Sequence, residues 1–105
     1  MSDTLLNKVY SVCVEGLYSR PILEVINELY PNMSDREKAG IADYLKRVKD
    51  DIEDYFYYKY DHNNEANNSM LQKNGVGYFR EKYPWISKEN LIHTITRAMY
   101  YAWHG

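Results

Sequence analysis

Apolar residues recur at helical spacing along most of the chain, and the longest such run lies in the middle. It follows a capping box at residues 34–37, in which Ser34 precedes Glu37 by three positions. Apolar positions then alternate at intervals of four and three, which places them on one face of a helix. These positions are Ile41, Leu45, Val48, Ile52 and Tyr55 or Phe56. The pattern predicts a helix from Asp35 to about Tyr60, roughly 39 Å long at 1.5 Å per residue.

Two shorter helices are predicted before this one. The first runs from about Thr4 to Tyr18, because apolar residues recur there every three or four positions. Its stripe consists of Leu6, Val9, Cys13 and Leu17. The second begins at Pro21, since proline fits a first helical turn, where its missing N–H would have no partner. It ends at Tyr30, because the residue before a proline is disfavoured in the helical region.

The helical signal is weaker in the C-terminal part. Residues 61–75 are predicted to form a loop, because asparagine favours turns over helix interiors. The asparagines that crowd this segment are Asn63, Asn64, Asn67, Asn68 and Asn74. A short helix is expected from about Val76 to Lys82, followed by a break at Pro84. A last helix starts after Ser87 and continues close to the C-terminus. Its broad apolar face comprises Leu91, Ile92, Ile95, Ala98, Met99, Ala102 and Trp103.

These elements predict an all-α protein. No segment alternates apolar and polar residues at the period of two that a strand requires. Five glycines and three prolines are also few for 105 residues. The expected architecture is a single domain over residues 1–105, a bundle of about five helices around one core. Three helices occupy residues 4–60, the asparagine-rich loop covers 61–75, and two helices occupy 76–104.

Composition removes several functional classes. No apolar run approaches the 18 residues of a membrane span, and the N-terminal residues lack the basic and apolar regions of an export signal. A lone cysteine suits a reducing compartment, so we expect a cytoplasmic protein. One cysteine and three scattered histidines do not make a metal site. No glycine-rich phosphate loop is present, and we predict no cofactor.

Catalysis finds little support in the residue pattern. An enzyme would have to use His93 or the acidic stretch from Asp61 to Glu65, and neither pairs a nucleophile with a base at usable spacing. Cys13 falls on the apolar stripe of the first helix, where a thiol is usually an inert hydrophobe. We therefore predict no catalytic residue and a non-enzymatic function.

Residues 50–61 stand out because they combine acids with tyrosines. The segment carries five carboxylates and one lysine, a net charge of −4, whereas the whole chain has a net charge of −2. Four of the twelve tyrosines lie in it. Helical geometry turns its apolar positions to the core and a second stripe outward. We predict that this outward stripe binds a partner. Its residues are Asp50, Asp51, Asp54, Tyr57, Tyr58 and Asp61.

The residue types in this stripe suit a protein interface. Tyrosine offers a large contact area, a polar tip and little rotamer entropy to lose, and carboxylates steer a basic partner and raise its association rate. The structural alternative is that the tyrosines pack against neighbouring helices while the acids only keep the helix soluble. Against it, like-charged acids repel one another near a helix C-terminus, where the macrodipole also disfavours anions. A surface patch that carries only negative charge therefore indicates a functional role.

The same segment resembles the immunity proteins that bacteria make against their own nuclease toxins. The colicin-type members are four-helix domains that neutralise a basic nuclease with acidic residues and an adjacent tyrosine pair. The likeness rests on the pair Tyr57–Tyr58 with Asp50, Asp51 and Asp54. This chain is longer, and Lys59 rather than a proline follows its tyrosine pair. The resemblance therefore implies the broader class of helical immunity proteins, which includes those of contact-dependent inhibition systems.

The main hypothesis is a non-enzymatic inhibitor that binds a basic protein, a toxin nuclease domain, and is itself a monomer or weak dimer. The alternative is a small nucleic-acid-binding transcriptional regulator. Three cations at residues 46–49 would serve that role, but Asp43 and Asp50 lie within one turn of them. Binding to nucleic acid needs a basic surface for the phosphates, and a chain of net charge −2 has few cations to spare.

Overall fold

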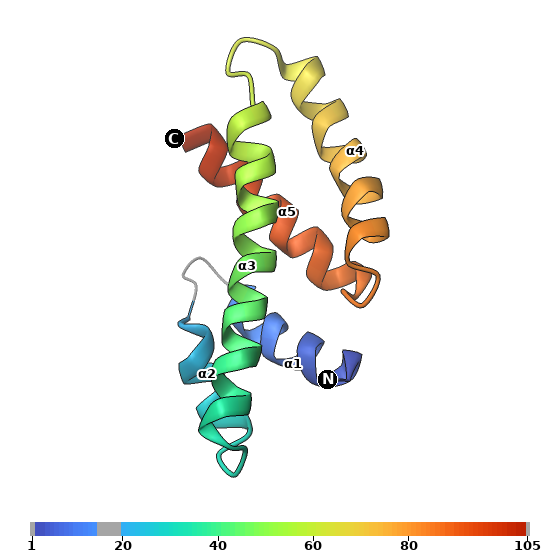
Figure 1. The fold of residues 1–105 in the computed structure, drawn as a ribbon. Helices are drawn as coiled ribbons and strands as arrows, with labels where there is room; N and C mark the ends of the chain where they lie inside the picture. The colour runs from blue at the N-terminus through green and yellow to red at the C-terminus, as the bar shows by residue number, and fades with distance from the viewer. Residues whose placement is uncertain (1, 15–19, 105) are drawn as a thin grey trace.

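The computed structural model describes residues 2–14 and 20–104. Five α-helices account for most of this part of the chain: α1 (Asp3–Val14), α2 (Ile22–Leu29), α3 (Asp35–Lys59), α4 (Glu65–Lys82) and α5 (Lys88–His104). The prediction of an all-α single-domain bundle of about five helices is confirmed (Figure 1). None of these helices is both long enough and apolar enough to cross a membrane. The predicted end of the first helix, residues 15–18, lies outside the described residues.

The longest helix, α3, runs along most of the molecule, whose extents are 49 × 26 × 19 Å (Figure 1). Ser34 caps the helix as expected, because its hydroxyl accepts a hydrogen bond from the Glu37 backbone N–H at 3.2 Å. The helix ends at Lys59, one residue short of the predicted limit. Its buried face holds the predicted stripe and includes Ile41, Leu45, Val48, Ile52 and Phe56.

The buried side chains form two clusters along α3, so the prediction of one core is wrong. The first cluster joins α1 and α2 to the first half of α3. The second joins the second half of α3 to α4 and α5. Tyr44 and Trp85 pack against both clusters, and the Trp85 indole N–H donates to the Tyr44 hydroxyl at 2.8 Å. A helix of 25 residues is roughly 37 Å long, so helices packing on one side of it gather in two groups.

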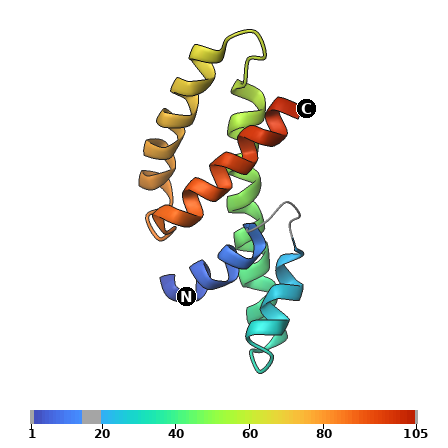
Figure 2. The same ribbon diagram turned by 180° about the vertical axis from the view of Figure 1, so that it is seen from behind.

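The prediction of a loop over residues 61–75 is wrong for most of its length. The connection after α3 is short, because α4 already begins at Glu65. The helix then continues through Val76, where the sequence predicted a separate short helix. The predicted loop and short helix are therefore largely one helix of 18 residues, which runs beside the second half of α3 in both views (Figures 1 and 2).

The asparagines of this segment explain the error, because they organise the start of α4 instead of breaking it. Asn64 is the N-cap, and its side-chain oxygen accepts a hydrogen bond from the Asn67 backbone N–H at 2.9 Å. The Asn68 side chain is buried and donates to the Asp61 carbonyl at 2.7 Å, while it accepts from the Asp61 N–H at 3.0 Å. Capping is the one helical role for which asparagine is favoured.

A polar contact fixes the start of α5 against α1. The Asn7 side-chain oxygen accepts from the Ser87 backbone N–H at 2.8 Å and from the Asn90 amide at 3.1 Å. The Asn7 amide donates to the Trp85 carbonyl at 2.7 Å. From there α5 crosses α3 on the side opposite to the viewer of Figure 1, and it lies in front in Figure 2. Because the two helices cross, the side of α3 turned away from α5 faces solvent in Figure 1, and the side of α5 turned away from α3 faces solvent in Figure 2.

Candidate functional site

The second half of α3 presents two tyrosines and two acids on its solvent-facing side, which we call the acid/tyrosine band (Asp50, Asp54, Tyr57 and Tyr58). Their side chains are all exposed. Tyr57 is 55% exposed and Tyr58 is 80% exposed, although each is a large aromatic residue. The two rings meet edge to face, with centroids 5.4 Å apart and planes at 89°. The band therefore has an aromatic end and an acidic end, separated by about one helical turn.

The two acids of the band are not paired with any cation in the described part of the chain. Among the residues described, neither Asp50 nor Asp54 has a cationic nitrogen within 4.0 Å. Both lie on the face of α3 opposite to its buried stripe. Because no packed neighbour partners these carboxylates, their charge is directed to solvent and to any molecule that approaches this side.

Asp51 is the predicted site residue that the structure takes up in the fold. Its carboxylate accepts a hydrogen bond from the Tyr83 hydroxyl at 2.6 Å and forms an ion pair with Lys82 at 2.7 Å. Partial burial raises the pKa of the Asp51 carboxyl, but the hydrogen bonds from Lys82 and Tyr83 outweigh it and hold that pKa below its usual value. For Tyr83, burial and the Asp51 carboxylate raise the pKa of the phenol to about 12. Asp51 thus ties α3 to the end of α4.

Removing only the Tyr83 hydroxyl tests this tie. We expect Tyr83→Phe to lower the free energy of unfolding by about 1 kcal/mol at pH 7, because the hydrogen bond is lost while the ring still packs. The pKa of the Asp51 carboxyl is lower in the folded protein than in the unfolded chain. Asp51 therefore stabilises the fold at pH values above its unfolded pKa, and this stabilisation is lost as the pH falls through its folded pKa. The difference between the two proteins, measured by urea unfolding, should therefore shrink between pH 7 and about pH 3. Tyr78→Phe, on a ring that is 48% exposed, is the control and should change little at either pH.

The other two acids of the segment are also engaged within the chain. Glu53 forms an ion pair with Lys49 at 3.0 Å, and both side chains are partly buried. The Asp61 carboxylate accepts from the Asn63 backbone N–H at 2.9 Å and so shapes the turn that leads into α4. Asp61 is exposed but follows the helix end. The charge that this segment presents to solvent is therefore smaller than its composition suggests, and it is concentrated at Asp50 and Asp54.

The tyrosines of the segment divide between packing and exposure. Tyr55 is partly buried and stacks on Tyr78, with ring centroids 5.4 Å apart and planes at 14°. It also meets Phe79 edge to face, with centroids 5.1 Å apart. The structural alternative, in which tyrosines pack against a neighbouring helix, therefore describes Tyr55. It does not describe Tyr57 and Tyr58, which are exposed.

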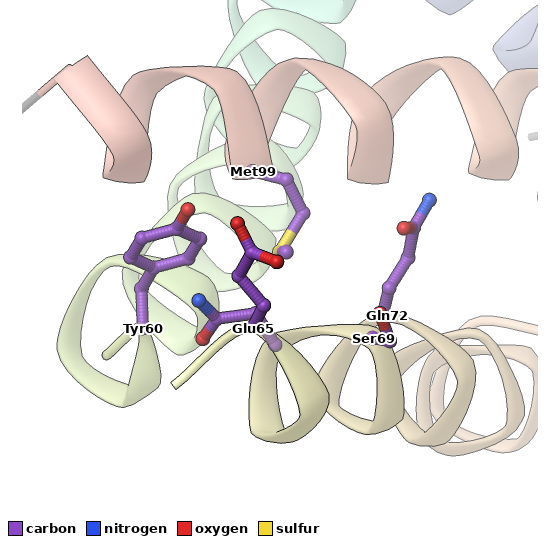
Figure 3. Close-up of a pocket in the computed structure, with 6 residues that line it drawn as sticks. Tyr60, Glu65, Ser69, Gln72 and Met99 are labelled. Atoms are coloured by element: carbon purple, nitrogen blue, oxygen red, sulfur yellow. The ribbon is translucent and has the colours of Figure 1, made fainter. Parts of the chain in front are cut away.

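A shallow pocket of about 270 Å³ lies between the end of α3, the first half of α4, and α5 (Figure 3). Its lining combines polar side chains with the Tyr60 ring and the Met99 thioether: Tyr60, Glu65, Asn68, Ser69, Gln72 and Met99. Figure 3 shows Tyr60 and Glu65 beside Met99, with Gln72 reaching toward α5 further along. The sequence analysis missed this pocket, because a predicted loop has no defined face. Ligand pockets are usually larger than about 300 Å³, so this one suits a single side chain or a small polar group.

The residues weighed for chemistry lie apart from one another. Cys13 is buried, and burial raises the pKa of its thiol to about 11, which keeps it protonated. His93 is partly buried on α5, while Asp61 belongs to the turn before α4. Over residues 2–14 and 20–104, no three acidic, cysteine or histidine side chains come together as metal ligands would.

The acid/tyrosine band has the chemistry of a protein-binding surface. An adjacent pair of exposed phenols supplies contact area and hydrogen-bonding tips. The two carboxylates next to them, which no cation of the described residues pairs, attract cationic groups. The helix that carries the band is held on its opposite side by both core clusters. Compared with models of protein families, with curated proteins and with solved structures, the chain gives no match.

Proposed function

We propose that this protein is a non-enzymatic inhibitor that binds a basic protein partner through the acid/tyrosine band, and that the partner is a bacterial toxin nuclease domain. In this role the phenols of Tyr57 and Tyr58 anchor the centre of the interface. Asp50 and Asp54 take the place of nucleic-acid phosphates against the cations of the nuclease. The likeness to immunity proteins in residues 50–58 supports the nature of the partner.

The observation that carries the proposal is the exposure of Tyr57 and Tyr58 beside two carboxylates that have no counter-ion among residues 2–14 and 20–104. Aromatic residues are enriched in interface centres and supply most hot spots. Among the described residues, no side chain covers these rings and no cation pairs these carboxylates. Exposed aromatic rings next to such carboxylates are typical of a surface that a partner covers.

The nucleic-acid alternative is weakened by the surroundings of its cations. Lys49 pairs with Glu53, and Lys82 pairs with Asp51. Arg97 is buried, and its guanidinium donates to the Val14 carbonyl at 3.1 Å. Lys49 and Arg97 are engaged within the fold and Lys82 is held by Asp51 at the surface, so these three cations are less available for the phosphate contacts that dominate affinity for DNA.

The proposal is tested by capture followed by an activity assay. The tagged protein is used to retain partners from its native lysate at low salt, and a retained basic protein is purified and assayed as a nuclease. We expect one partner, bound in a one-to-one ratio, whose nuclease activity is abolished at equimolar inhibitor. A partner that is acidic, or a nuclease that keeps its activity at saturation, contradicts the proposal.

The salt dependence of association provides a second test. Because Asp50 and Asp54 steer a cationic partner, the association rate should fall by about tenfold or more between 20 and 500 mM salt, while the dissociation rate changes less. Stopped-flow measurements on Asp50→Asn/Asp54→Asn should show a lower rate at low salt and a flatter dependence. Asp43→Asn, an exposed acid in the first half of α3, is the matched control. Equal effects per removed charge in the two variants would show that net charge rather than the band steers the partner.

A further inference from the structure

The last helix has a second apolar stripe that does not contribute to the core. The buried residues of α5 include Leu91, Ile95, Ala98 and Ala102. Another set of α5 residues, spaced at three, four, four and three, lies on the opposite side of the helix and is exposed throughout. We call this set the α5 outer stripe: Glu89, Ile92, Thr96, Tyr100 and Trp103. The broad apolar face predicted from the sequence is therefore two faces, of which one is solvent-exposed.

The α5 outer stripe exposes unusually large apolar side chains. Ile92 is 41% exposed, Tyr100 is 50% exposed and Trp103 is 58% exposed. Glu89 is its only acidic residue, and the one arginine of α5, Arg97, points inward. The stripe is turned away from the buried face of α5, and α5 lies behind α3 in Figure 1 and in front of it in Figure 2. It is thus on the opposite side of the molecule from the acid/tyrosine band.

The spacing of the stripe is the same when it is followed in either direction from Thr96. Ile92 and Tyr100 lie four residues to each side, and Glu89 and Trp103 lie seven residues to each side. A twofold axis through Thr96 therefore pairs each position of one stripe with the position equally far beyond Thr96 in a second stripe, with the helix direction reversed. We propose that a second copy of this chain covers the α5 outer stripe, with the two α5 helices antiparallel and crossing at Thr96.

Contacts and charges are complementary in this arrangement. Ile92 of each copy meets Tyr100 of the other, and the small Thr96 on the axis lets the helices approach closely. Glu89 comes next to the indole N–H of the opposite Trp103, so its carboxylate gains a donor. Lys88 comes near the C-terminal end of the opposite α5, where backbone carbonyls carry a partial negative charge. The acid/tyrosine bands remain on the outer sides of the pair, far from one another and free to bind.

The size of the stripe sets the strength of the pairing. A stable interface buries about 800 Å² on each partner, and one helix face supplies less, so the dimer forms only at high concentration. Sedimentation velocity should show a mass of 12.5 kDa in dilute solution that rises toward twice this value between about 10 µM and 1 mM. Thr96→Arg should keep the mass of a single chain over the whole range, because it places two like charges on the axis. Tyr58→Arg, an equally exposed change on the opposite side of the molecule, should leave the rise intact.

Cysteine cross-linking tests the register independently of affinity. Helix axes 8–10 Å apart bring facing Cα atoms within about 4–6 Å of each other, which a disulfide can span. Under mild oxidation Thr96→Cys should link to itself, and Ile92→Cys should link to Tyr100→Cys in a mixture of the two variants. Asn67→Cys, exposed on α4, should not cross-link, and buried Cys13 should stay unreactive in all variants. A mass of 12.5 kDa at every concentration, or Ile92→Cys linking to itself faster than Thr96→Cys, overturns the proposal.

Discussion

A chain with alanine at both Tyr57 and Tyr58 is expected to bind the basic partner at least about a hundredfold more weakly than the wild type. Truncating a central interface tyrosine commonly costs about 2 kcal/mol, and two adjacent hot spots lose somewhat less than the sum. A loss of about 2.8 kcal/mol corresponds to a hundredfold change in the dissociation constant. The loss should appear mainly as faster dissociation, because these rings anchor the complex and the neighbouring carboxylates govern its formation.

The same double variant should fold normally, which separates binding from structure. Tyr57 and Tyr58 contact one another but are mostly exposed, so their removal should change the free energy of unfolding by less than about 1 kcal/mol. Calorimetric titration gives the affinity and urea unfolding gives the stability. Tyr100→Ala, on the opposite side of the molecule, is the control at concentrations too low for self-association and should bind like the wild type. A double variant that unfolds would show that these rings belong to the core, and one that binds normally would remove the band from the interface.

Replacing Gly75 by alanine should lower the free energy of unfolding by about 1–3 kcal/mol. This sign is the opposite of the usual one, since alanine in a helix interior is favoured over glycine by about 1 kcal/mol. A Cβ on Gly75 would lie 2.3 Å from Cζ of Phe56 and 2.9 Å from its Cε1. Phe56 is fully buried and meets Tyr55 edge to face with centroids 5.0 Å apart. The ring therefore has little room to move, and α4 would have to shift away from α3.

Gly77 provides a matched control on the same helix. A Cβ there would meet no atom within 4 Å, so Gly77→Ala should raise the free energy of unfolding by about 0.5–1 kcal/mol. A smaller side chain opposite Gly75 should relieve the clash, and Gly75→Ala should cost less in a Phe56→Leu background than in the wild type. Urea unfolding of the four proteins gives this coupling. Equal costs in both backgrounds would show that the close approach to Phe56 is not the reason for glycine.

The elements that sequence patterns predicted best are those whose signals are local. α3 follows from a capping box within four residues and from a stripe that repeats along the helix, so its start and end were predicted to within one residue. α4 has no such stripe. Gly75 is buried because α4 approaches Phe56 closely, and Asn68 is satisfied by the backbone of Asp61. Both residues argue against a helix when they are considered alone, and only these tertiary contacts make them favourable.

The same distinction applies to the candidate site. Helical spacing sufficed to place Tyr57 and Tyr58 outward, since the facing of a residue follows from its register with the buried stripe. It could not show that Asp51 is paired, because Lys82 and Tyr83 are more than thirty positions away in the sequence and reach it only through the packing of α4. Nor could it divide the apolar residues of α5 between core and solvent. Ile92 and Trp103 are as apolar as the residues that α3 covers.

The packing of α3 against two core clusters along its length affects how much conformational entropy the band loses when it binds a partner. A surface on a frayed helix end or a loop loses conformational freedom when a partner arrives, and that loss subtracts from the affinity. Here the backbone beneath Asp50 and Asp54 is held by buried Val48, Ile52 and Phe56 on its inner side. Folding has therefore already ordered the backbone of the band, and only its side chains have freedom left to lose. Most of the contact energy of Tyr57 and Tyr58 then remains available as affinity.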